Sequence, residues 1–141
     1  GGGGAAPATA AALGLAVLLL VRPAPPPTAG LVAVLTGSDG RPVWLVRATG
    51  DEQALGARLL AEQPEPGQVP ELWLIPPGPT QPLSLGVLDP DGSNRRPLTL
   101  PAGALAPGAA LAVSLEPPGG SPTGQPTGPV VSQGVLIADP T

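Results

Sequence analysis

Residues Leu111–Gly128 read LAVSLEPPGGSPTGQPTG, and this stretch is the most informative about the fold. Its first side chains alternate between two sets, which are Leu111, Val113 and Leu115, and Ala112, Ser114 and Glu116. Alternation of this kind predicts a β-strand with one buried face. The prolines and glycines that follow predict that the strand ends in a loop. The stretch therefore indicates a β-rich domain.

Short apolar runs separated by turn residues continue on both sides of this stretch, which is typical of an all-β chain. The strands that we expect are Leu31–Leu35, Val43–Arg47, Val69–Ile75, Leu83–Leu88, Pro97–Leu100, Ala109–Glu116 and Gly134–Ala138. Between the first two, Asp39 and Gly40 provide the positive-φ positions of a tight turn. We therefore expect these two strands to form a hairpin.

One segment, Asp51–Gln63 (DEQALGARLLAEQ), supports two interpretations. Apolar residues at helical spacing follow acidic residues, as they do at the start of a helix. Residues that alternate as in a strand are also present, at Leu55, Ala57, Leu59 and Ala61. Gly56 would cost a helix about 1 kcal/mol relative to Ala, which favours the strand.

The chain of 141 residues has the length of one domain. Its 21 glycines and 23 prolines amount to about 31% of the residues, a level at which disorder must be considered. However, 42% of the residues are hydrophobic and only 11% are charged, whereas disordered chains are poor in apolar residues and rich in charge. We therefore place the glycines and prolines in turns between strands.

The charged and aromatic residues are few. A net charge of −4, with six arginines and no lysine, leaves no basic stripe for the phosphates of a nucleic acid, so no nucleic-acid partner is expected. Arg95 and Arg96 are assigned to a solvated loop, with contact to acidic partners or headgroups as the alternative. Trp44 and Trp73 lie in apolar runs, so we expect core packing rather than stacking on a ligand.

The N-terminal part differs from the rest. Residues 1–22 are predicted to form a transmembrane helix, because Ala5–Val21 contains no charge. A helix over this run would be about 25 Å long, a little less than the roughly 30 Å of a bilayer core. A signal-peptide apolar region and an ordinary core helix are the alternatives. The prolines in residues 23–30 end any helix and predict a stiff stalk, after which residues 31–141 form the β domain.

Candidate catalytic chemistry is sparse. The chain contains no His, Cys, Lys or Tyr, so the usual general bases and nucleophiles are missing, as are thiolate metal ligands. We assign no catalytic, cofactor-binding or metal-binding residue and do not expect an enzyme. Asp89, Asp91 and Asn94 faintly resemble a calcium loop, but the distal Glu of such a loop is absent, and we expect a plain turn.

Four carboxylates near strand ends are predicted to be solvated charges rather than the paired acids of a glycoside hydrolase, namely Glu62, Glu65, Glu71 and Glu116. Ser114 and Ser121 have no His partner. The loop Pro117–Pro129 is interpreted as a long crossover between two strands. Because long loops in compact domains are often functional, contact with a partner or signal is the alternative.

Four segments, taken together, resemble a known family. They are Gly40–Val46 (GRPVWLV), Glu71–Gly78 (ELWLIPPG), Ser84–Gly92 (SLGVLDPDG) and Leu111–Gly128. In this order they resemble the extracytoplasmic C-terminal domain of RskA-type anti-sigma factors. The resemblance implies an all-β domain, an antiparallel β-sandwich or partly open barrel, and a strand within Asp51–Gln63.

The resemblance also implies a function. Such a protein is anchored in the cell membrane by a single helix and holds an extracytoplasmic-function sigma factor through a cytoplasmic domain that this chain does not include. Its outer domain shields a juxtamembrane segment, here between Arg22 and Gly30, from a site-1 protease. After that cut an intramembrane protease releases the sigma factor. The alternative is a membrane-tethered surface β-sandwich that binds carbohydrate or an envelope protein.

Overall fold

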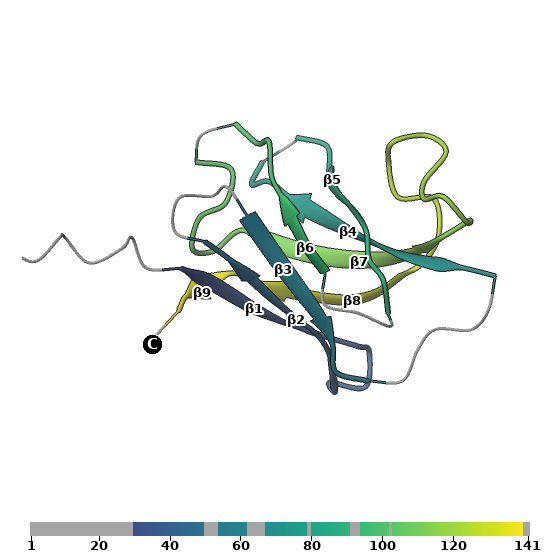
Figure 1. Cartoon of the computed structure of the whole chain (residues 1–141), viewed down its shortest axis with the longest axis horizontal. Helices are drawn as coiled ribbons and strands as arrows, with labels where there is room; N and C mark the ends of the chain where they lie inside the picture. Colours follow the sequence, from purple (N-terminus) through teal and green to yellow (C-terminus); the bar gives the residue numbers. More distant parts are fainter. Residues whose placement is uncertain are drawn as a thin grey trace, which may run out of the picture.

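The computed structural model describes residues 30–49, 54–61, 67–78, 80–90, 94–101 and 103–139. Over these ranges the chain forms nine strands and no helix (Figure 1). The strands are β1 (Leu31–Thr36), β2 (Pro42–Ala48), β3 (Ala54–Leu59), β4 (Val69–Ile75), β5 (Leu83–Val87), β6 (Asn94–Pro97), β7 (Ala110–Glu116), β8 (Val130–Val135) and β9 (Ile137–Ala138). The predicted all-β class is confirmed.

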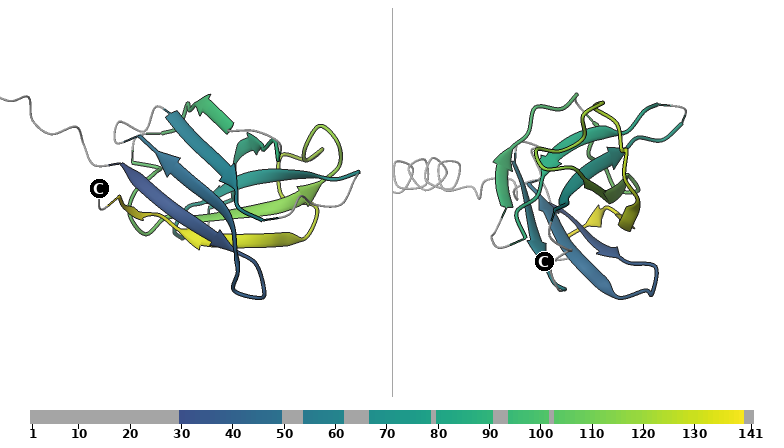
Figure 2. Two further views of the ribbon diagram at one scale, coloured as in Figure 1. Left: turned by 60° about the horizontal axis from the view of Figure 1, so that its bottom comes forward. Right: turned by 90° about the vertical axis from the view of Figure 1, so that its right-hand side faces the viewer.

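All nine strands belong to one antiparallel sheet. The order across the sheet is β5-β4-β7-β8-β1-β2-β3-β6, and β9 pairs with β1 beside β8. The sheet curls strongly, as Figure 2 shows, so that β2, β3 and β6 lie across from β4 and β5. Of the two architectures that the resemblance implied, the curled sheet corresponds to the partly open barrel.

The inner face of the curled sheet holds the hydrophobic core. Alternate residues of each strand point inward, and those most fully buried are Leu35, Trp44, Val46, Leu72, Leu74, Leu111 and Val113. The side chains come from four strands, β1, β2, β4 and β7, and the last two are far from the first two in the sequence. Removal of this apolar surface from water is therefore the main force that holds the curled sheet together.

Most predicted strands are confirmed to within a residue or two, and the hairpin between β1 and β2 turns at Gly40, where φ is 79°. Two predictions are displaced. The strand predicted at Pro97–Leu100 lies three residues earlier, because Ala54–Ala57 of β3 pairs with Asn94–Pro97. The strand predicted at Gly134–Ala138 is instead β8 and β9, which Leu136 separates. The described part of Asp51–Gln63 is β3, as the resemblance implied.

Side chains, rather than a backbone ladder, connect the two end strands of the sheet. The Arg96 guanidinium, on β6, donates from Nη2 to the Val87 carbonyl at 2.6 Å and from Nη1 to the Leu85 carbonyl at 3.4 Å. Gly86 lies between these carbonyls with φ of 110°, and a Cβ there would collide with the guanidinium. Asn94 donates to the carbonyls of Asp89 and Ala57. Arg96 and Asn94 therefore hold the barrel seam together.

We expect Arg96→Met to lower the free energy of unfolding by about 2 kcal/mol, because two charge-assisted hydrogen bonds across the seam are lost. Urea denaturation of the full chain followed by far-UV circular dichroism measures the change. Arg95→Met is the matched control, because Arg95 is exposed on the opposite face of the same strand and should change stability by less than about 0.5 kcal/mol. Equal losses for the two variants would show that Arg96 does not hold the seam.

Several sequence predictions lie outside the described residues. They are the transmembrane helix over residues 1–22, the stalk up to residue 29, and the side chains of Glu62, Glu65 and Asp91. In the part of the chain that is described, no helix is long and apolar enough to cross a bilayer.

Candidate functional site

The long loop between β7 and β8 is an ordered structure that turns back on the strands beside it (Figure 1). We name residues Pro117–Pro129 the crossover loop. Its sharp turns use Gly119, Gly120 and Gly124, whose φ values of 93°, 98° and 78° favour glycine. The ends of the loop are tied together, because the Leu115 amide donates to the Pro129 carbonyl at 3.0 Å. Local backbone geometry and this closing hydrogen bond thus contribute to the path of the loop.

The carboxylate of Glu116, the last residue of β7, binds the far end of the crossover loop. The Thr127 amide donates to both carboxylate oxygens, at 3.2 Å to Oε1 and 3.1 Å to Oε2. The Thr127 hydroxyl also donates to Oε1, and the Gly128 amide donates to Oε2 at 3.1 Å. Glu116 is 1% exposed. One buried carboxylate therefore satisfies three donors of the loop.

A second carboxylate, Glu71 on β4, binds the near end of the same loop. The Ser121 amide donates to Oε1 at 2.6 Å, and the Ser84 hydroxyl of β5 donates to Oε2 at 2.5 Å. Gly120 passes so close to Oε1 that a Cβ there would lie 2.9 Å from it. Glu71 is 6% exposed. The crossover loop is thus held at both ends by acids from neighbouring strands, since Glu71 pairs with Ser114 in the register of β4 and β7.

Trp73 extends this polar network below the loop. Its indole N–H donates to the Ser114 hydroxyl at 2.8 Å, and that hydroxyl donates to Glu116 Oε2 at 2.6 Å. Trp73 lies between Leu72 and Leu74 of the core, so its side chain is on the opposite face of β4. Core packing of Trp44 is confirmed, but the two tryptophans stabilise different faces of the sheet.

Two predictions about this region are wrong. Glu71 and Glu116 are buried and hydrogen-bonded, not solvated, and β7 has two buried faces instead of one. The reason is that the crossover loop supplies backbone donors for the polar face of the strand. The sequence did contain a signal for this burial, because an acid ends the strand and the loop that follows contains Ser, Thr and Gly, whose small side chains leave their amides accessible. The signal could be interpreted only once the position of the loop was known.

The pKa of Glu116 reflects two opposing effects. Burial raises the pKa of this carboxyl, and hydrogen bonds from Ser114, Thr127 and Gly128 lower it. The hydrogen bonds prevail, so the pKa lies below its ordinary value of 4.5. Glu116 is therefore ionised at neutral pH, and the negative charge strengthens its hold on the loop.

The sequence of the chain matches one known family. The family model of the anti-sigma-K factor RskA, C-terminal region, matches residues 4–130. The chain belongs to this family. No curated protein matches, and no solved structure matches. The match includes the whole crossover loop, and the RskA family is one of anti-sigma factors, which are regulatory proteins.

In this RskA-family domain the two acids connect the crossover loop to the strands beneath it. The oxygens of Glu71 and Glu116 accept hydrogen bonds from Ser84, Ser121, Ser114, Thr127 and Gly128. These hydrogen bonds fix the crossover loop over the paired strands β4 and β7.

The other candidates have local roles. Asn94, which was considered for a calcium loop, accepts from the Asp89 amide at 2.6 Å, so its side chain is used in the turn. Among the residues that the structure describes, no group of three His, Cys, Asp or Glu is placed to hold a metal. Arg95 and Arg96 were assigned to a loop, but both lie on β6. Arg96 bridges the seam and Arg95 is exposed.

Proposed function

We propose that the chain is the membrane anchor and extracytoplasmic domain of an anti-sigma factor, and that the domain controls proteolytic release of an extracytoplasmic-function sigma factor. The family match over residues 4–130 carries this proposal, because it includes both the apolar segment and the β domain up to the start of β8. The sigma factor is bound by a cytoplasmic part of the protein outside this chain. A site-1 protease and an intramembrane protease are the other partners.

The way in which the chain enters the domain supports a shielding role. The first strand, β1, is paired on both sides, with β2 on one side and with β8 and β9 on the other. The Gly30 carbonyl accepts a hydrogen bond from the Asp139 amide at 2.8 Å, and the Asp139 carboxylate lies 3.2 Å from Arg47 Nη1. We name this pairing of Ile137–Asp139 with the start of β1 the clasp.

The clasp suggests how a folded domain protects the residues before it. A protease binds several residues of its substrate in extended form, so a cut close to Gly30 requires the start of β1 to leave the sheet. Because β1 is a central strand, it leaves only when the clasp or the whole sheet opens. In the proposed mechanism a signal favours the open form, and the chain itself catalyses no reaction.

External proteolysis of intact cells that express the full chain tests both topology and shielding. Proteinase K, which does not cross membranes, should cut slowly between Arg22 and Gly30. A variant that ends at Leu136 lacks the clasp, and we expect its cut to be about three to ten times faster, since local opening then needs less free energy. Asp39→Ala, in the exposed turn at the other end of β1, is the control.

Two results of this experiment would count against the proposal. If the cut appears only after the cells are lysed, the domain does not face outward. If the wild-type chain and the variant that ends at Leu136 are cut between Arg22 and Gly30 at the same rate, the domain does not shield that segment.

A further inference from the structure

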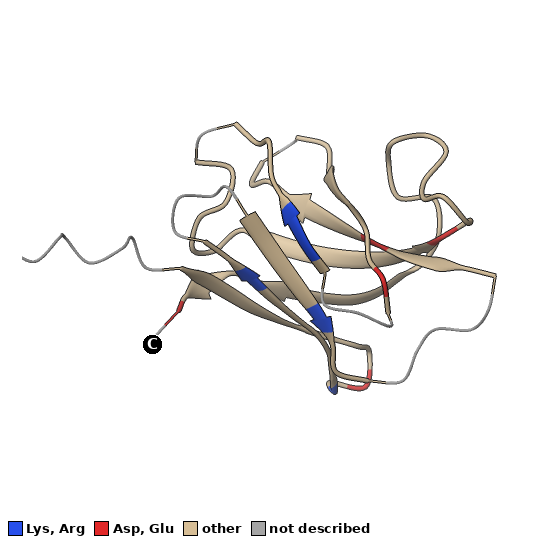
Figure 3. Ribbon diagram, viewed as in Figure 1, with Lys and Arg blue, Asp and Glu red and all other residues tan. Residues whose placement is uncertain are grey.

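Arginines and aliphatic residues share the outer face of the sheet across β9, β1, β2, β3 and β6. The strand register places one row of neighbours there, which is Ile137, Val32, Arg47, Gly56 and Arg95. In the next row Val34 pairs with Leu45, and Leu45 pairs with Arg58. The exposed aliphatic side chains Val34 and Ile137 lie on β1 and β9. The arginines lie on β2, β3 and β6 (Figure 3). The face therefore has an apolar half and a basic half.

Three arginines surround a glycine in the basic half. Arg47 and Arg95 flank Gly56 on the strands to either side, and Arg58 follows it by two residues on the same face of β3. With strands about 4.8 Å apart, the Cα atoms of Arg47 and Arg95 are about 10 Å apart, and that of Arg58 lies about 7 Å from Gly56. An extended arginine spans most of such a distance. The three guanidiniums can therefore converge on one group above Gly56.

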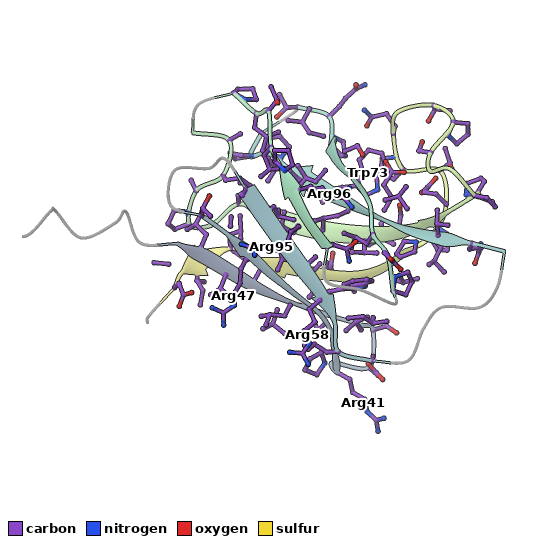
Figure 4. The ribbon with its side chains drawn as sticks, in the orientation of Figure 1. Arg41, Arg47, Arg58, Trp73, Arg95 and Arg96 are labelled. Carbon is purple, nitrogen blue, oxygen red and sulfur yellow. The ribbon has the colours of Figure 1, made fainter. Side chains whose placement is uncertain are left out.

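A groove of about 510 Å³ lies at this place, and its lining includes Arg47, Gly56, Arg58 and Arg95. Figure 4 shows the three arginines as sticks on adjacent strands. The carboxylate of Asp139 also lines the groove and pairs with Arg47. The charged side chains of the lining thus sum to about +2 in a chain whose net charge is −4.

Two of these arginines have no polar side-chain partner in the described part of the chain. Neither Arg58 nor Arg95 makes a side-chain hydrogen bond or ion pair with a described residue, in contrast to Arg96 at the seam. Gly56 is not required by its backbone or by its neighbours either, because a Cβ there would make ordinary contacts, at 3.5 Å from the Asn94 carbonyl oxygen. Folding alone therefore explains neither the unpartnered charges nor the missing side chain between them.

We propose that this arginine groove binds a phosphate group. Guanidinium is planar, remains charged at any physiological pH and donates in pairs to phosphate oxygens, and the groove falls in the size range of small-ligand sites. The exposed Val34 and Ile137 beside it favour a phosphate that carries acyl chains. The phosphate belongs either to a lipid headgroup or to a soluble molecule. The inference does not depend on the anti-sigma role.

Nuclear magnetic resonance of the full chain in a neutral detergent tests the proposal. The probes are inorganic phosphate and dihexanoyl phosphatidate, with octyl glucoside as the uncharged amphiphile. We expect both phosphates to shift the Gly56 amide and the arginine Nε–H signals, and octyl glucoside to shift neither. If phosphatidate binds at least about fivefold more tightly than inorganic phosphate, the source is a lipid, because the acyl chains contact the apolar half. Equal affinities assign a soluble phosphate.

Three variants show whether the arginines bind the phosphate. Arg95→Gln should weaken phosphate binding about tenfold through loss of a charge-assisted contact. Gly56→Leu should abolish binding, because its side chain fills the space between Arg47 and Arg95. Arg41→Gln is the matched control, because Arg41 is exposed in the β1–β2 turn outside the groove. If Gly56→Leu does not fold, the double variant Arg58→Gln, Arg95→Gln replaces it.

Three outcomes would overturn the proposal. In the first, neither phosphate probe shifts the signals of the groove. In the second, phosphatidate binds equally well to the wild type and to Arg95→Gln, which would mean that only the apolar half takes part. In the third, a tetraglutamate peptide binds the groove more tightly than either phosphate, which would assign it to an acidic protein partner.

Discussion

Glu116→Ala should lower the free energy of unfolding by about 3 kcal/mol, because it leaves the Thr127 and Gly128 donors of the crossover loop and the buried Ser114 hydroxyl without an acceptor. Glu116 is 1% exposed and Ser114 is 0% exposed, so water cannot simply replace the lost carboxylate at the Ser114 hydroxyl. Urea denaturation of the full chain measures the loss. Hydrogen exchange should show the amides of Thr127 and Gly128 losing protection before the core does.

Two variants control for this result. Glu116→Gln keeps the shape but turns one acceptor into an amide donor that faces other donors, so it should recover little of the stability. Asp39→Ala removes an acid whose side chain is 62% exposed and whose Oδ1 accepts, among the described residues, only the Arg41 amide of its own turn, so it should change stability by no more than about 1 kcal/mol. A loss for Glu116→Ala no larger than that for Asp39→Ala would mean that the loop is not held by this carboxylate.

The same carboxylate predicts a pH dependence of stability. The pKa of Glu116 is lower in the folded domain than its ordinary value of 4.5, so ionisation favours the folded state. Its contribution is complete above the pKa of the unfolded chain and disappears as the pH falls through the lower pKa of the folded domain. The stability difference between wild type and Glu116→Gln should therefore shrink as the pH falls below 4.5. A constant difference from pH 7 to pH 2 would contradict this assignment.

Trp44→Ala should have the largest effect, a loss of about 4 kcal/mol in the free energy of unfolding, because it removes a large side chain from the centre of the core. Trp44 is 2% exposed and is a member of the core cluster with Val46 and Leu72. The fluorescence of the remaining tryptophan, Trp73, reports unfolding in urea. For a small domain a loss of this size is a large part of the total stability.

A surface substitution provides the comparison for Trp44. Val135→Ala trims a side chain that is 52% exposed on the outer face of β8, and it should change stability by less than about 0.5 kcal/mol. If Trp44→Ala costs no more than Val135→Ala, the inner face of the sheet is not the main core of the domain.

Much of the fold was predictable because its signals are local. The strand at Val69–Ile75 was predicted at its observed bounds, and the turn at Gly40 was predicted from the Asp-Gly pair. Both depend on residues that are neighbours in the chain. The family was also recognisable from short segments in order, and the match over residues 4–130 confirms it.

The candidate site was predicted less well. The crossover loop was identified as a long connection with a potential role in partner contact, but the acids that hold it were placed in solvent. Glu116 is buried because the loop brings the amides of Thr127 and Gly128 back to its carboxylate. The sequence around residue 116 does not predict this path of the loop. Likewise, β6 begins at Asn94 because β3 pairs with it there.

The sequence alone specified short alternating strands and tight turns, because alternation and backbone preference act over a few neighbouring residues. Its composition also showed that the usual catalytic side chains are missing. Only the tertiary structure decided that the sheet curls into one partly open barrel, that two acids are buried under a loop, and that Arg47, Arg58 and Arg95 lie around Gly56. The physical reason is that strand pairing and burial join residues far apart in the sequence. Their free energies depend on the partner as much as on the residue itself.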